Sequence, residues 1–193
     1  AGLDTALDFI RHHHGAHGGL VNGLLAPDRV ETCTRPLLER TMAAAGELDC
    51  PVRIHMAQGK FELDVMDHLH GATGPQWLAR HGLLNDRLIA PHGTYATDVD
   101  VALDAENGVS LAHSPLVAAR MGSVLKSFAS FRRARVNIGM ATDTAPSGTT
   151  LIRLLSKQEM GGPQGPPISL DWYQPIPAGR GSRGGRHRHC CWW

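Results

Sequence analysis

Residues 51–59 decide the fold, and they read Pro51-Val52-Arg53-Ile54-His55-Met56-Ala57-Gln58-Gly59. A short apolar run ends here in a histidine, and the chain then breaks at a polar residue and a glycine, which predicts a buried strand over residues 52–57. Two later segments, residues 87–93 and 136–143, repeat this design and end in a His-Gly pair and an aspartate. The sequence therefore predicts three strands that each carry one metal-ligand type of side chain at their ends.

Helical patterns alternate with apolar strands along the chain. We expect strands near residues 20–26, 52–57, 87–91, 109–112 and 136–141, and helices near residues 3–11, 34–46, 61–69, 77–81, 98–107 and 124–134. This alternation predicts an α/β fold whose parallel strands are buried on both faces and joined by crossover helices. A doubly wound open sheet satisfies the pattern equally well, but its usual glycine-rich phosphate loop is missing after the first strand. Polar residues at the end of strand after strand favour a barrel.

The length of the chain limits how much of a barrel it can form. It has 193 residues, whereas a complete (β/α)8 barrel takes roughly 250. We therefore expect a partial TIM-type barrel, about strands 4 to 8, over residues 1–160. Residues 161–193 are rich in glycine, proline and arginine and predict a disordered tail that is not native to the barrel; an RGG-like nucleic-acid segment and a His/Cys metal tract are the alternatives.

The composition bounds the class of protein and its partners. A net charge of +1 with 42% hydrophobic residues is typical of a globular protein and gives no general reason to expect a nucleic-acid or membrane partner. No apolar run approaches the roughly 20 residues that span a bilayer, and no secretory pattern opens the chain, so we expect a cytoplasmic protein. A partial barrel exposes sheet edges, which leaves self-association into a homo-oligomer open. Cys33 and Cys50 are expected to be ordinary reduced thiols.

The strand-end residues His55, His92 and Asp143 suit a hydrolytic metal site if their strands are neighbours. Zinc and iron accept imidazole and carboxylate ligands, and a hydrolytic site gathers them from different elements while leaving a position for water. A lone strand-end histidine is more often structural, so the prediction depends on the three residues together. The histidines of residues 12–17 lie among glycines, and we expect them to be solvated.

Four short motifs, taken in order, carry a family resemblance. They are Ile-His-Met-Ala-Gln at residues 54–58, Ala-Pro-His-Gly at 90–93, Leu-Ala-His-Ser-Pro at 111–115 and Gly-Met-Ala-Thr-Asp-Thr-Ala-Pro at 139–146. Over residues 20–147 the sequence resembles the metal-dependent amidohydrolases, in particular the branch of cytosine-type and other heterocycle deaminases and triazine chlorohydrolases. The resemblance implies one divalent metal, with zinc expected rather than iron, and a small-molecule substrate.

The resemblance also implies roles for individual residues. His55 and His92, from strands five and six, would be metal ligands. Asp143, from strand eight, would bind the metal and take a proton from the attacking water, while His113 on strand seven would orient or activate that water. Tyr95, just past His92, would line the substrate pocket, although a packing or surface position suits a tyrosine as well.

The chain departs from the family pattern in two places. Deaminases of the family usually carry a glutamate where this chain has Gln58; glutamine can hold a substrate by a hydrogen bond but cannot shuttle protons to leaving ammonia. Glu62 lies one helical turn onward and is expected to be solvated. The His-x-His pair of the family's first strand is also missing before Leu20; residues 12–14 have that spacing but follow a helix.

These observations predict a metal-dependent hydrolase that acts on carbon–nitrogen or carbon–halide bonds of a small heterocycle. Because a first-strand ligand pair is missing, we expect this chain to be a weakly active or inactive fragment. The alternative is a non-catalytic binding or scaffold protein that uses its basic tail for a nucleic-acid partner.

Overall fold

A computed structural model of the chain describes residues 2–115, 127–141 and 143. The helices are α1 (Gly2–His13), α2 (Ala16–Gly19), the 3-10 helix η1 (Val30–Thr32), α3 (Arg35–Glu47), α4 (Lys60–His70), α5 (Gly74–Arg80), α6 (Asp98–Glu106) and α8 (Phe128–Arg133). The strands are β1 (Val52–Arg53), β2 (Leu88–Pro91), β3 (Ser110–His113) and β4 (Asn137–Met140). The division of the chain at residue 160 lies outside the described residues.

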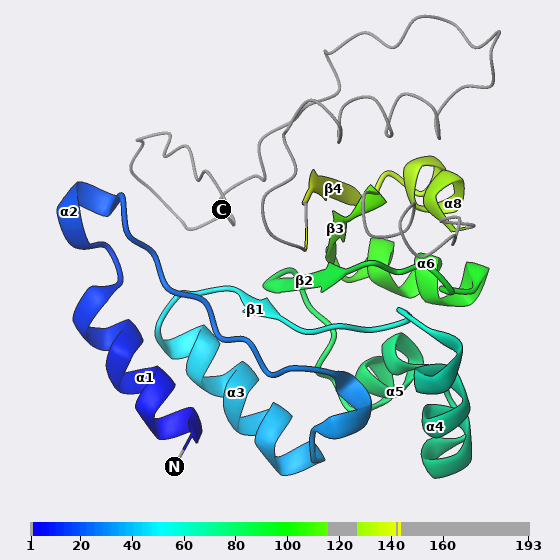
Figure 1. Cartoon of the computed structure of the whole chain (residues 1–193), viewed down its shortest axis with the longest axis horizontal. Coiled ribbons are helices and arrows are strands. Elements are labelled where there is room, and N and C mark those ends of the chain that lie inside the picture. The colour runs from blue at the N-terminus through cyan, green and yellow to red at the C-terminus, as the bar shows by residue number, and fades with distance from the viewer. Residues whose placement is uncertain (1, 116–126, 142, 144–193) are drawn as a thin grey trace, which may run out of the picture.

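The four strands form one parallel sheet in the order β1-β2-β3-β4, which is their order along the chain (Figure 1). Val52 lies opposite Leu88, Ile89 opposite Ser110, and His113 opposite Met140. Each strand is separated from the next by at least one helix, as parallel pairing requires. Parallel strands end at the same edge of a sheet, so the residues that follow β1, β2 and β4 meet there.

The helices follow the strands in the same sequential order. Helix α5 packs against α6, and α6 packs against α8, so that these helices cover successive strands (Figure 1). Helix α6 begins with a capping box: the Thr97 hydroxyl accepts from the Asp100 N–H, and the Asp100 carboxylate accepts from the Thr97 N–H. This reciprocal pair fixes where α6 starts after the loop that carries His92.

The hydrophobic core has two parts. The larger one gathers fully buried side chains of α3, β1, α5 and β2, among them Leu38, Val52, Leu78 and Leu88. The smaller one consists of Val101, Leu111, Phe131 and Val136, which join α6, β3, α8 and the approach to β4. Both parts lie between strands and helices. β2 and β3 are largely buried, as the sequence predicted, whereas β4 is half-buried and Arg53 of β1 is exposed.

Two predicted strands differ from the structure. Residues 20–26 form no regular strand; only Leu25 pairs in parallel with Val52, because Leu20 and Val21 are exposed and Val21 instead bridges Ala16. The predicted strand 52–57 is regular only over β1, although isolated parallel bridges at His55 and Met56 continue its pairing. No helix in the described part of the chain is long and apolar enough to cross a membrane.

Candidate metal centre

His55, His92 and Asp143 lie together at the C-terminal edge of the sheet. Met56 and His92 form a parallel bridge, and the rings of His55 and His92 stack with their centroids 5.5 Å apart. Asp143 follows β4, and its Oδ2 lies 3.6 Å from His92 Nε2. One ligand atom from each of the three residues lies within 4.8 Å of the others. The structure therefore brings together the three residues that the sequence singled out as ligands.

The environment of His92 suits a neutral metal ligand. The residue is 5% exposed, and among the described residues its Nε2 has no hydrogen-bond partner. Burial lowers the pKa of His92, while the Asp143 carboxylate opposes this effect and the nearby His55 adds to it. A buried imidazole nitrogen without a partner normally costs stability. A divalent cation would fit this donor set, because it would satisfy Nε2 and neutralise the Asp143 charge.

The backbone carbonyl of Asp28 orients the His55 ring. Its Nδ1 lies 2.7 Å from the backbone carbonyl oxygen of Asp28, and the His55 N–H donates to the same oxygen. A carbonyl can only accept, so Nδ1 carries the proton and Nε2 keeps its lone pair for a ligand bond. No signal in the sequence indicates this role of Asp28, because every residue has a backbone carbonyl.

Three residues at this edge have left-handed backbone conformations. Ala57, His92 and Asp143 have φ angles of 52°, 74° and 61°. Such angles are unfavourable for residues with a Cβ and concentrate at functional sites. At His92 the turn continues into Gly93, which also has a positive φ and packs under Leu111 and Phe131.

Gln58 is held from two sides just beyond β1. Its side-chain Oε1 accepts a hydrogen bond from Arg29 Nη1 at 2.7 Å. Its backbone N–H donates to Glu62 Oε2 at 2.8 Å, and the neighbouring Ala57 N–H donates to Glu62 Oε1 at 2.5 Å. The prediction that Glu62 is solvated is wrong: the residue is 2% exposed because it satisfies the two N–H groups of the turn. Burial raises the pKa of the Glu62 carboxyl.

Sequence reasoning missed Arg29 and the function of Glu62, although Glu62 had a detectable signal. It occupies the third helical position after Gly59, from which an acidic side chain can reach back to N–H groups before the helix. Arg29 carried no such signal, since it reaches Gln58 only through the pairing of residues 28–30 with the end of β1.

His113 lies at the end of β3 and is fully buried. Its ring stacks on Phe128 with the centroids 4.4 Å apart, and burial, followed by the charge of His92, lowers the pKa of His113 to about 4. The imidazole is therefore neutral near pH 7.

Tyr95 is half-buried, and its backbone N–H donates to Ala57 O. This bond connects the loop after β2 to the turn after β1. The pocket-lining role of its side chain stays a prediction.

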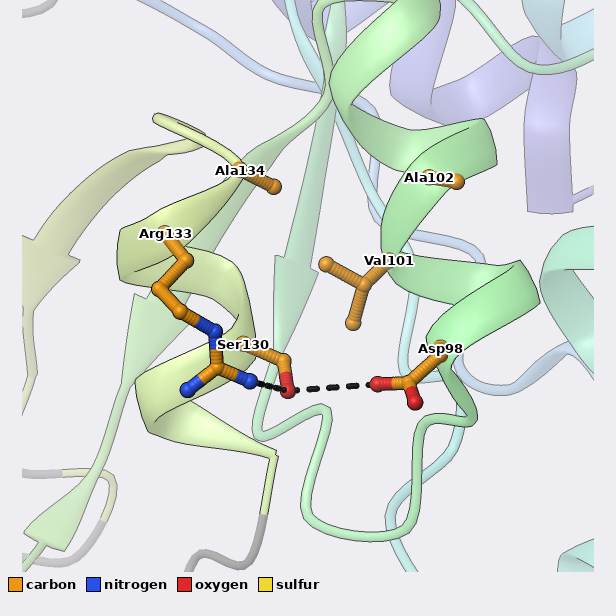
Figure 2. A pocket seen from close by; sticks show the side chains of 6 residues that line it. All are labelled: Asp98, Val101, Ala102, Ser130, Arg133 and Ala134. Carbon is orange, nitrogen blue, oxygen red and sulfur yellow. Dashed lines mark hydrogen bonds between the residues drawn. The ribbon is translucent and has the colours of Figure 1, made fainter.

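A concave region lies between α6 and α8 (Figure 2). It has a volume of about 400 Å³ and is lined by Asp98, Val101, Ala102, Ser130, Arg133 and Ala134. Ser130 links the two helices by donating to Asp98 and accepting from Arg133. The lining includes none of His55, His92 and Asp143, so this hollow is separate from the candidate metal centre.

Comparison with known sequences gives a consistent result. The model of the family described as "Amidohydrolase family" matches residues 4–168. The chain is 28% identical over 176 residues to a 5-methylthioadenosine/S-adenosylhomocysteine deaminase of Desulforudis audaxviator, which covers 87% of this chain and 41% of the relative. It is 32% identical over 132 residues to the deaminase of the same description from Pyrococcus horikoshii, covering 68% of this chain and 31% of the relative. The chain thus spans less than half the length of these relatives.

Solved structures share the fold. An adenosine deaminase from Xanthomonas campestris with bound zinc superposes with a TM-score of 0.67 at 30% identity, covering 72% of this chain and 31% of the other. Atrazine chlorohydrolase TrzN from Arthrobacter aurescens, in complex with zinc, superposes with the same TM-score at 26% identity and similar coverage. These likenesses confirm an α/β fold that forms part of a TIM-type barrel. With the family match over most of its length, the chain belongs to the amidohydrolase family.

Proposed function

We propose that the protein is a metal-dependent hydrolase that cleaves carbon–nitrogen or carbon–halide bonds of a small heterocyclic substrate. The convergence of His55, His92 and Asp143 within 4.8 Å carries this proposal. Two imidazoles and one carboxylate from three separate strands are a donor set suited to zinc, and zinc is the metal bound in the similar solved structures. The deaminase and chlorohydrolase relatives support the two kinds of bond.

A divalent cation held by these residues would supply Lewis acidity, which lowers the pKa of a water molecule beside it. Asp143 lies at the edge where this water would sit, and its second carboxylate oxygen would take the water's proton. His113 is neutral near pH 7, so its imidazole would orient the water as a hydrogen-bond partner without adding a positive charge. Gln58 would hold the heterocycle.

The leaving group is where Gln58 becomes important. An amino group leaves a ring carbon as ammonia only after the amino group has been protonated, whereas chloride leaves as a stable anion. A carboxamide has no acidic proton to give, and Arg29 already occupies its oxygen. We therefore propose that a halide or another good leaving group suits this site better than an amine does.

Zinc binding tests the proposal directly. Isothermal titration of the metal-free chain with Zn²⁺ should reveal a site that depends on these residues, and His55→Ala, His92→Ala or Asp143→Ala should each weaken it by at least tenfold. His68→Ala is the matched control, because His68 is an exposed histidine of α4. Because we expect this chain to be weakly active at most, any hydrolysis of chloro- and amino-substituted purines and triazines by the zinc-loaded chain should fall with the same three substitutions. If His55→Ala and Asp143→Ala change neither the zinc affinity nor the rate of hydrolysis, the proposal is wrong.

Other predictions from the sequence stay predictions. A basic tail that binds nucleic acid would lie in residues 161–193, outside the described part of the chain. Self-association also stays a prediction, since the structure contains one copy.

A further inference from the structure

One row of side chains crosses all four strands on the face of the sheet that carries His55. The register pairs Arg53 with Ile89, Ile89 with Ser110, and Ser110 with Asn137; we call these four residues the inner row. Residues paired in this way on neighbouring strands point to the same face of the sheet. Arg53 precedes His55 by two residues, so the inner row lies roughly 7 Å from the level of His55, toward the N-terminal ends of the strands.

The opposite face of the sheet packs on helices. Val52, Leu88 and Ala90 belong to the larger part of the core, and Leu111 belongs to the smaller part. These residues alternate along the strands with those of the inner row. In a TIM-type barrel the helices form the outer ring, while the other face of the strands fills the interior in layers that branched apolar residues dominate. The inner row therefore belongs to the interior of the barrel, yet Ile89 is its only apolar member.

The polar members of the inner row differ in how they are satisfied. Asn137 Nδ2 donates to Ser110 Oγ at 3.0 Å, so the two neutral side chains pair with each other. Arg53 is exposed, and its guanidinium forms no hydrogen bond or ion pair with any residue that the structure describes. Its backbone is fixed, because the Arg53 N–H donates to Leu25 O. The sheet thus holds a positive charge on its inner face without a carboxylate to balance it.

A guanidinium inside a closed barrel requires a negatively charged partner, because an unpaired charge is very costly to remove from water. Each interior layer is built from alternate strands. Arg53 on β1 and Ser110 on β3 supply two members of such a layer, so two further strands complete it. The chain matches 41% of the length of the Desulforudis audaxviator relative, and the greater part of that relative has no counterpart in this sequence.

We propose that the inner row docks a polypeptide that completes the barrel and that carries an inward-facing aspartate or glutamate at the level of Arg53. The ion pair makes Arg53 the residue that selects this polypeptide by its charge. A second copy of the chain does not fit, because its inner row would bring another arginine to this face instead of an acid. The inference concerns the assembly of the barrel, so it does not depend on zinc binding or on hydrolysis.

Selection from a library tests the proposal. The library consists of the first three barrel strands of the Desulforudis audaxviator deaminase with their connecting helices, and the inward-facing positions of the strands are randomised. It is displayed on yeast and sorted for binding to the full 193-residue chain. Clones that bind the wild type should be enriched in aspartate and glutamate at one inward-facing position. Clones selected on Arg53→Glu should be enriched in lysine and arginine there, and clones selected on Arg53→Met in neither charge.

A double-mutant cycle on one selected clone measures the ion pair. Replacing the selected acid by its amide should weaken binding to the wild type about tenfold or more and leave binding to Arg53→Met unchanged. Arg35→Met is the matched control, because it removes an exposed arginine that pairs with Glu39 on α3; this variant should keep the preference for an acid. An absence of binding clones, or an acid preference that survives Arg53→Met, would overturn the proposal.

Three measurements on the chain alone exclude other sources of the negative charge. The urea midpoint of unfolding should be the same for the wild type and Arg53→Met; a lower midpoint in the variant would show that a carboxylate of this chain already pairs with Arg53. Titration with sodium acetate should show no binding that depends on Arg53. In sedimentation velocity, self-association should be equal for the two proteins. A difference between wild type and Arg53→Met in any of the three would contradict the proposal.

Discussion

The imidazole rings of His55 and His92 lie nearly parallel, with an angle of 20° between their planes, although they come from different strands. This arrangement follows from the parallel bridge between Met56 and His92, which places the two strand ends side by side. The two rings can therefore present nitrogens to one cation without a change in the sheet. The strand pairing thus brings the two histidines of the candidate metal centre together.

Replacing Gln58 should change which leaving group the site prefers. Gln58→Glu keeps an oxygen for Arg29 but introduces a carboxyl group that can carry a proton, so it should favour amine over chloride as leaving group. We expect the ratio of kcat/KM for adenosine to that for 6-chloropurine riboside to rise by about tenfold or more. Asn22→Asp makes the same change of charge at an exposed residue and should leave the ratio unaltered; an unaltered ratio in Gln58→Glu would contradict the proton-shuttle argument.

Glu62 should prove important for stability. Glu62→Gln keeps one acceptor oxygen but turns an amide N–H toward one of the two N–H groups that the carboxylate now serves. Leaving a buried donor unsatisfied costs about 1–3 kcal/mol, which urea denaturation would measure. Glu39→Gln, on the exposed face of α3, should change the free energy of unfolding by less than about 0.5 kcal/mol. Equal effects of the two substitutions would show that Glu62 is not the acceptor for the turn.

Gly93 should not tolerate a side chain. Its φ is +58°, and a Cβ there would lie 2.9 Å from Leu111 Cδ1 and from Phe131 Cε2. We expect Gly93→Ala to lower the free energy of unfolding by about 1–3 kcal/mol through overpacking alone, and to weaken zinc binding because His92 precedes it. Gly46→Ala is the control, since Gly46 lies within α3 with open space around it; this change should be neutral or stabilising by up to about 1 kcal/mol. Thermal denaturation of both variants gives the comparison.

Asp104 should make stability fall as the pH rises. Burial, followed by the charge of Asp100, raises the pKa of Asp104 to about 8, and among the described residues its Oδ1 has no hydrogen-bond partner. The folded protein thus keeps a proton that the unfolded chain releases above its ordinary pKa of 3.8. Stability is full below that value and declines by up to about 1.4 kcal/mol per pH unit until about pH 8.

Asp104→Asn removes this titration with little change of shape. The variant should be less sensitive to pH between 5 and 8 and should exceed the wild type by at least about 1 kcal/mol at pH 8. Asp67→Asn, at an exposed residue of α4, serves as the control for the change of charge. Chemical denaturation at several pH values is the measurement, and parallel curves for wild type and Asp104→Asn would refute the prediction.

The sequence predicted the parallel fold because its strands are short apolar runs separated by helical periods. β2, β3 and β4 lie within one residue of their predicted ranges at either end. Residues 20–26 are also apolar, yet they form no regular strand: Leu25 pairs in parallel with Val52, whereas Val21 bridges Ala16 and Leu20 is exposed. Composition alone does not reveal such a contact between distant segments.

The residues of the candidate site also form two groups, those that the sequence could predict and those that it could not. The proximity of His55, His92 and Asp143 could be predicted because polar residues that follow apolar runs can be read from the sequence, whereas their role as ligands stays a prediction. Asp28, Arg29 and Glu62 could not be given their roles, because each acts on a backbone group or on a side chain that only the pairing of strands brings near. Residues that orient the ligands and Gln58 thus depend on tertiary contacts.

The left-handed backbone at His92 and Asp143 means that the site and the free energy of folding favour different amino acids. Glycine at either position would relieve a conformational strain of about 1–2 kcal/mol, but it would also delete a candidate metal ligand. Random mutagenesis with selection for thermal resistance alone would therefore favour substitutions that replace His92 and Asp143. Selection that also demands zinc would keep both residues in spite of their strain.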